Sequence, residues 1–100
     1  MGTFVFSSHD GYGLGHVRRN ALLAAEVRRQ SPGARTVIVT GVEAPLPWLE
    51  GVEVVRVPSL VKDRAGRYVN DTMDQAEALQ RRADAFDEVI ERVRPDVVVV

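Results

Sequence analysis

The sequence contains no cysteine, so its 100 residues offer neither a disulfide nor a thiolate metal site. It also lacks any apolar run of about 20 residues, the length that a membrane-spanning helix needs. Neither sign of charge dominates, because 13 basic side chains stand against 14 acidic ones. A balanced chain has no basic footprint for nucleic acid, so we expect no nucleic-acid partner. The start, Met1-Gly2-Thr3, lacks the charged and apolar regions of a signal peptide, which makes a cytoplasmic location the default expectation.

What is present is ordinary globular material, with 45% apolar and 27% charged residues. Such a composition favours a folded domain with a buried core, and 100 residues suffice for one small domain or for part of a larger one. The chain stops inside an apolar segment, residues 95–100, that reads as a strand. Strands of this kind belong in the middle of a parallel sheet. We therefore expect the natural protein to continue beyond Val100, and residues 1–100 to be a partial N-terminal domain.

Hydrophobic periodicity predicts four strands and two helices. The strands are expected at 3–8, 36–40, 52–57 and from 95, the third of them nearer the edge of a sheet. The first helix should span 15–30, with an inner face at Val17, Ala21, Ala24 and Arg28. The second should begin after a cap at Asn70 or Asp71 and run to about residue 94, with an apolar stripe at Ala76, Leu79, Ala83, Phe86, Ile90 and Val93. Residues 41–51 and 58–70 are expected to be loops.

This order of elements predicts an α/β fold with a Rossmann-like, open and mostly parallel sheet. Right-handed crossovers give the strand order 3-2-1-4, with helices flanking the sheet. Ligands in such sheets bind beyond the carboxyl ends of the strands, where the strand order reverses. That point lies between the first and fourth strands. Residues 8–15 follow the first strand directly and are expected there.

A glycine-rich segment occupies this position. Gly11, Gly13 and Gly15 alternate and lead into His16 at the start of the first helix. A strand, a glycine turn and a helix N-terminus can present backbone N–H groups to a phosphate or carboxylate. The dinucleotide fingerprint is not matched because its third glycine is replaced by His16, and no P-loop lysine follows. A tight turn of any doubly wound fold is the alternative interpretation of the glycines.

His16 is the candidate catalytic residue. Imidazole suits proton transfer near neutral pH, and the glycines remove side-chain bulk around it. A structural role, as a helix cap or a satisfied polar contact, is the alternative. Arg18 and Arg19 oppose the dipole of the first turn, which indicates an anionic partner for at least one of them; two solvated arginines are the alternative. Asn20 receives no role. In the second loop, Lys62, Arg64, Arg67 and Tyr68 are a possible acceptor-binding segment, or a plain surface loop.

Residues 8–25 resemble a known pattern. Gly13-Leu14-Gly15-His16 with Arg19, an alanine-rich helix, Pro32-Gly33 and a strand ending in Thr40-Gly41 look like the N-terminal domain of GT-B glycosyltransferases. The resemblance extends to predicted bacterial glycosyltransferases, to the N-acetylglucosaminyltransferase of peptidoglycan lipid-intermediate synthesis and to nucleotide-sugar hydrolases of the pseudaminic acid pathway. It covers nearly the whole chain in layout, but its motif lies in residues 8–25 alone.

The resemblance implies a sugar transfer from a nucleotide-sugar donor to a hydroxyl acceptor, without metal and without a further cofactor. It implies that His16 is the general base and that Gly11, Gly13, Gly15 and Arg19 contribute to the diphosphate site. The donor pocket would belong to a C-terminal domain outside this chain, so the fragment alone is expected to be inactive. Peripheral membrane association of the full-length protein is a further expectation. The alternatives are a nucleotide-sugar hydrolase, in which His16 activates water, and a non-catalytic binding module.

Overall fold

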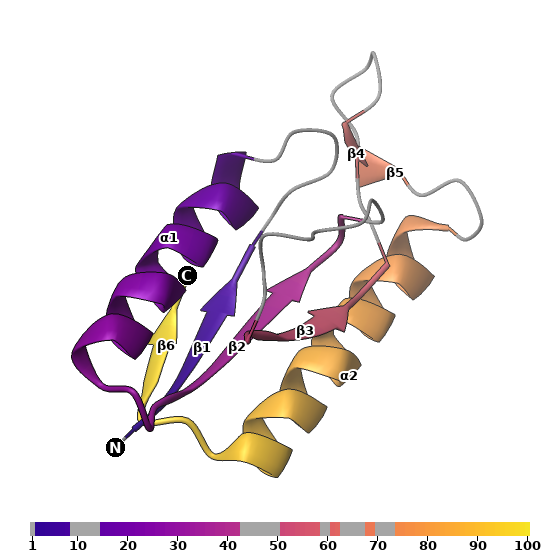
Figure 1. The fold of residues 1–100 in the computed structure, drawn as a ribbon. Coiled ribbons are helices and arrows are strands. Elements are labelled where there is room, and N and C mark those ends of the chain that lie inside the picture. The colour runs from indigo at the N-terminus through magenta and orange to yellow at the C-terminus, as the bar shows by residue number, and fades with distance from the viewer. Residues whose placement is uncertain (1, 9–14, 43–50, 59–60, 63–67, 70–73) are drawn as a thin grey trace.

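A single parallel sheet organises the chain (Figure 1). The computed structural model describes residues 2–8, 15–42, 51–58, 61–62, 68–69 and 74–100. Within them, β1 (Thr3–Ser7), β2 (Arg35–Thr40), β3 (Glu53–Arg56) and β6 (Val97–Val99) pair in the order β3-β2-β1-β6, all parallel. The predicted order 3-2-1-4 is confirmed, and so is the position of the third strand at an edge.

Two helices cover the two faces of this sheet (Figure 1). The first, α1 (Gly15–Gln30), begins and ends at the predicted residues, and the second is α2 (Gln75–Val93). The alternation of side chains along the strands sends neighbouring residues into two separate clusters. Phe6 and Ile38 pack with Val17 of α1, whereas Val5 and Val37 pack on the other face. The α2 face also contains Val39, Val57, Val89 and Val93.

The start of α2 differs from the prediction. Asp74 is the N-cap, with its Oδ1 accepting a hydrogen bond from the Glu77 amide at 2.8 Å. The predicted caps, Asn70 and Asp71, lie outside the described residues. Asp followed three residues later by Glu is the pattern of a capping box, and it favours residue 74 over the earlier candidates. The helix ends at Val93, and Arg94 adopts the left-handed conformation that closes it.

The predicted stripe of α2 is confirmed in its second half and wrong in its first. Val93 is buried and Phe86 packs against the core. Ala76, Leu79 and Ala83 are exposed, and the buried residues include Ala78 and Val89 instead. The inner face carries a charged residue, Arg82, at a spacing of four from Ala78. Its side chain is half-buried, and its Nη1 donates to the Pro58 carbonyl at 2.7 Å. An arginine on the inner face breaks the apolar pattern and explains why the sequence favoured a neighbouring stripe.

The second predicted loop contains regular structure. Two short strands, β4 (Val61–Lys62) and β5 (Tyr68–Val69), pair antiparallel, with Lys62 opposite Tyr68. The prediction of an irregular loop over 58–70 is therefore wrong for these residues. Two-residue strands carry too little periodicity to be recognised in the sequence.

The last strand is an edge strand of the described sheet. Val97 and Val98 are 42% and 40% exposed, so the expectation of a strand covered on both faces is not met within the 100 residues. The strand order itself puts β6 beside β1 alone, and α2 packs against the valines of β1 and β2 rather than against β6.

A bridging carboxylate ties α2 to the sheet at the amino ends of the strands. Glu53 of β3 contacts Arg35 at 2.8 Å and Arg92 at 2.7 Å. The hydrogen bonds from Arg35 and Arg92 lower the pKa of the Glu53 carboxyl. All three side chains are at least one third exposed, so solvent screening keeps the contribution small.

Replacing Glu53 by glutamine should lower the free energy of unfolding at pH 7 by roughly 0.5–1 kcal/mol, as expected for two partly exposed pairs. Because the folded-state pKa is lowered, the stabilisation is fully present above the unfolded pKa of about 4.3 and is lost as the pH falls through the folded value. Urea unfolding at pH 7 and at pH 2.5 measures this. Glu91→Gln, at an exposed position, is the control. An equal Glu53→Gln effect at both pH values would contradict the prediction.

Candidate functional site

The carboxyl ends of the strands, the start of α1 and the start of α2 lie at one end of the molecule, together with the β4–β5 hairpin (Figure 1). The chain leaves β1 to reach β2 through α1 on one face of the sheet, and reaches β6 through α2 on the other. The strand order therefore reverses between β1 and β6. The carboxyl end of β1 is thus the place at which an open α/β sheet binds its ligand.

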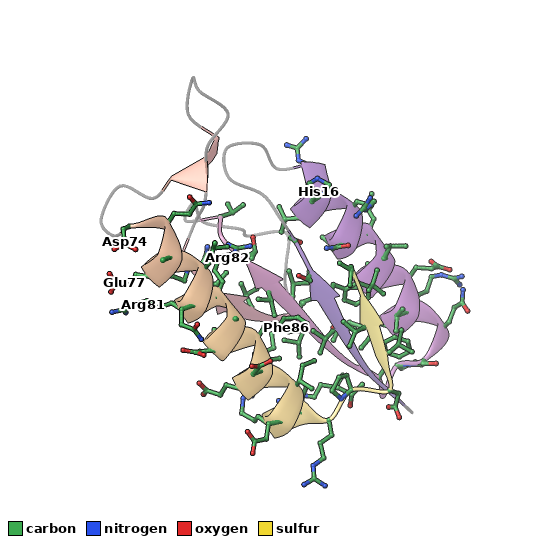
Figure 2. All side chains as sticks on the ribbon, turned by 180° about the vertical axis from the view of Figure 1, so that it is seen from behind. His16, Asp74, Glu77, Arg81, Arg82 and Phe86 are labelled. Atoms are coloured by element: carbon green, nitrogen blue, oxygen red, sulfur yellow. The ribbon has the colours of Figure 1, made fainter. Side chains whose placement is uncertain are left out.

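His16 lies at this end of the molecule, in the first turn of α1 (Figure 2). Its side chain is exposed. The first N–H groups of a helix have no acceptor within the helix, and the helix dipole places partial positive charge there. The structure therefore puts an accessible imidazole beside a helix terminus that suits an anion.

One helical turn along α1 from His16 lies a polar cluster, in which Asn20 and Ser8 are buried and Ser7 is half-buried. Asn20 is 0% exposed and comes one helical turn after His16, on the same side of α1. Its Nδ2 donates to the Ser8 hydroxyl at 2.7 Å and to the Ser7 carbonyl at 3.2 Å. The Ser8 amide in turn donates to the Val39 carbonyl at 2.9 Å. The end of β1 is thus fastened to α1 on one side and to β2 on the other.

Among the described residues, no donor reaches the Oδ1 of Asn20. Each hydrogen bond contributes about 0.5–1.5 kcal/mol net, while an unpaired buried acceptor costs about 1–3 kcal/mol, so the two effects are of similar size. Sequence reasoning gave this residue no role, although a signal exists: a polar residue of poor helix propensity stands between Val17 and Ala24 on the buried face.

The ends of β2 and β3 are held in the same manner. The Thr40 hydroxyl accepts a hydrogen bond from the Val42 amide at 3.1 Å, and the Val57 amide donates to the Thr40 carbonyl at 2.9 Å. Arg82 fixes the Pro58 carbonyl, and burial lowers the pKa of its guanidinium. Among the described residues no carboxylate pairs with Arg82. It is a half-buried cation at this end of the sheet (Figure 2), which sequence reasoning missed.

The predicted glycines are only partly described. Gly11 and Gly13 lie outside the described residues, and Gly15 is the first residue of α1. A Cβ built on Gly15 meets no atom of the described residues within 4 Å. Packing against the described residues therefore does not require glycine at this position. A ligand that approaches the backbone closely would favour glycine there.

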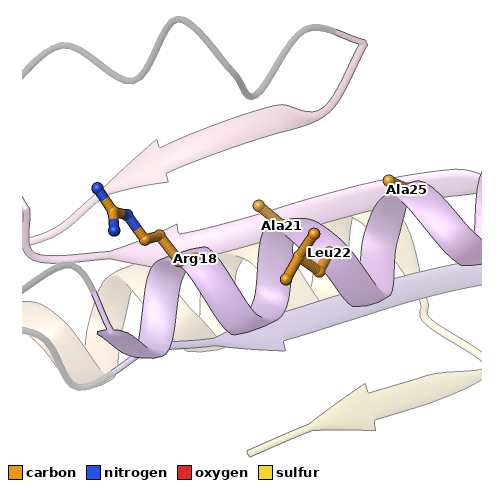
Figure 3. Close-up of a pocket in the computed structure, with 4 residues that line it drawn as sticks. All are labelled: Arg18, Ala21, Leu22 and Ala25. Atoms are coloured by element: carbon orange, nitrogen blue, oxygen red, sulfur yellow. The ribbon is translucent and has the colours of Figure 1, made fainter.

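The two arginines of the first turn are separated by helical geometry. Each residue turns the helix by about 100°, so Arg19 stays on the His16 side while Arg18 lies on the opposite side. Both are exposed. Arg18 lines a pocket of about 410 Å³ together with Ala21, Leu22 and Ala25, all on α1 (Figure 3). This largely apolar pocket lies along the flank of α1 and is separate from the His16 side.

The predicted acceptor-binding segment is described in two pieces. Lys62 and Tyr68 are paired residues of the β4–β5 hairpin, so the backbone brings them together. Arg64 and Arg67 lie outside the described residues.

Two further properties concern the described residues only. They contain no group of three or more His, Cys, Asp or Glu side chains that could hold a metal ion. Neither α1 nor α2 is long and apolar enough to cross a membrane.

The fold and this site together define a small α/β domain with a Rossmann-like parallel sheet. Comparison of the chain with protein-family models, with curated proteins and with solved structures finds no significant match. The similarity of residues 8–25 to the GT-B glycosyltransferases therefore stays a prediction.

Substituting Gly15 by alanine should leave the fold intact. The added methyl group meets open space, so the free energy of unfolding should stay within about 1 kcal/mol of the wild-type value. Thermal unfolding followed by circular dichroism measures this. Ala24→Leu is the contrasting variant, because Ala24 is 0% exposed and a larger side chain must overpack the core. A Gly15→Ala loss as large as that of Ala24→Leu would show that packing, not a ligand, requires the glycine.

Proposed function

We propose that this chain is the acceptor-side domain of a GT-B-type glycosyltransferase, which transfers a sugar from a nucleotide-sugar donor to a hydroxyl acceptor. One observation carries the proposal: an exposed imidazole, His16, stands at the start of α1, at the carboxyl end of β1 where the strand order reverses. Open α/β sheets bind their ligands at this point. Histidine is also the side chain used most often to transfer protons in catalysis.

In the proposed reaction His16 is the general base. The imidazole accepts the proton of the acceptor hydroxyl while that oxygen forms a bond to the anomeric carbon of the donor sugar. The bond from the anomeric carbon to the diphosphate oxygen breaks, and the nucleoside diphosphate leaves with the electron pair. The protonated imidazole then loses its proton to water. No metal ion takes part in this sequence.

The start of α1 supports the recognition of the diphosphate. The helix begins with Gly15 and carries no acidic residue in its first turn. Arg19 lies on the same side as His16, where a cation opposes the helix dipole unless an anion is bound nearby. A diphosphate beside Gly15 and Arg19 would relieve this unfavourable arrangement. Gly11 and Gly13 belong to the same proposed site by the motif alone.

The exposure of His16 also fits a hydrolase, because water reaches the imidazole as readily as a hydroxyl acceptor does. The two activities share the donor and the base. They differ in product: a hydrolase releases free sugar when no acceptor is present, whereas a transferase requires the acceptor.

The test is the turnover of the complete protein encoded by this reading frame, measured as nucleoside diphosphate released from a panel of nucleotide sugars. His16→Ala should lower kcat by about 10²–10⁴-fold, the usual contribution of a general base. Added imidazole should restore part of the activity, since it supplies the missing base. Arg18→Gln, on the opposite side of α1, should retain wild-type turnover.

Wild-type turnover in His16→Ala would refute the role of the base. A wild-type protein that releases no nucleoside diphosphate from any of the donors would refute the transferase and the hydrolase alike, and would favour a non-catalytic binding module.

A further inference from the structure

Asn20 is a fully buried polar side chain near the candidate site. It lies in the second turn of α1, is 0% exposed, and reaches the end of β1 through two hydrogen bonds from one Nδ2 atom. The two acceptors are consecutive residues: Ser7 is the last residue of β1, and Ser8 follows it. One side chain therefore links the end of β1 to the helix that carries His16.

Both ends of this link are held by further contacts, Ser8 by β2 and Asn20 by the core. Ser8 is 1% exposed and donates its amide to Val39 of β2 at 2.9 Å. Asn20 is held between Val17 and Ala24, which are buried in the core on the same face of α1. A shift of α1 along its axis would break the bond of 2.7 Å to the Ser8 hydroxyl. The position of the first turn of α1, relative to the end of β1, thus depends on Asn20.

We infer that Asn20 is the positioning residue of the candidate site. It sets the position of the first turn of α1, which carries His16, at the carboxyl end of β1, and it does not itself touch the reacting groups. The inference deepens the proposed function and rests on it for its catalytic consequence. The inferred effect is local: a change of Asn20 loosens the end of β1 more than the middle of the sheet.

The test separates local positioning from global stability by amide hydrogen exchange in the 100-residue chain. The Ser8 amide is compared with the amide of Ile38, in the middle of β2. Asn20→Leu keeps the number and branching of the side-chain heavy atoms and removes both hydrogen bonds. We expect the ratio of the Ser8 to the Ile38 exchange rate to rise at least tenfold. A residue that only stabilises the fold would accelerate both amides by the same factor.

Thr36 provides a matched control, because it is also buried and its Oγ1 also has no hydrogen-bond partner among the described residues. It lies opposite Phe4, towards the amino ends of the strands. Thr36→Val should leave the Ser8 to Ile38 ratio unchanged. A ratio within twofold of the wild-type value in Asn20→Leu would overturn the inference. If Asn20→Leu does not fold, Ser8→Ala removes the 2.7 Å bond alone and should raise the ratio about threefold, while an unchanged ratio overturns the inference.

The catalytic consequence is measured separately, in the complete protein. Asn20→Leu should lower kcat at least tenfold, while Thr36→Val should not. One outcome separates the two proposals: Asn20→Leu raises the exchange ratio, while His16→Ala and Asn20→Leu both keep wild-type turnover. Asn20 would then position the first turn of α1, but this turn would take no part in the transfer. The proposed function would then fail while the positioning role stands.

Discussion

The parallel pairing of β1 with both β2 and β6 is the constraint on which the rest of the structure depends. A parallel neighbour can be reached only by a crossover, and crossovers of this kind are right-handed. Since β1 has a neighbour on each side, one crossover runs over each face of the sheet. The two crossover helices therefore lie on opposite faces of β1. The same constraint puts the start of α1 there, and with it His16.

The core and the candidate site are connected through one buried polar contact. Val17 and Ala24 anchor α1 in the core by apolar packing, and Asn20 between them makes hydrogen bonds to the last residues of β1. Apolar contacts are not directional, so they fix the face of a helix more firmly than its position along the strand. Hydrogen bonds are directional, so they also fix the position of α1 along the strand. The apolar packing and the hydrogen bonds of Asn20 together fix the position of the start of α1.

Most of the fold could be predicted from the sequence because its signals are strong. The bounds of α1 followed from the glycines before it and from Ser31-Pro32-Gly33 after it, and the strand order followed from the handedness of crossovers. The first half of the inner face of α2 could not be predicted by hydrophobicity, since the half-buried Arg82 lies on it and donates to the Pro58 carbonyl. Of the candidate site, the sequence indicated His16 and Gly15 but not Asn20, whose importance lies in contacts with Ser7 and Ser8 more than ten positions away in the chain.

We propose above all that the start of α1 binds the diphosphate of the donor. The most direct measurement is a titration of the ¹⁵N-labelled chain with a nucleoside diphosphate, followed by the backbone amides. Binding at the helix start predicts saturable shifts at Gly15 and His16, accompanied by the side-chain amide of Asn20. Unchanged resonances at these residues, or shifts confined to the pocket around Ala21 and Ala25, would contradict it.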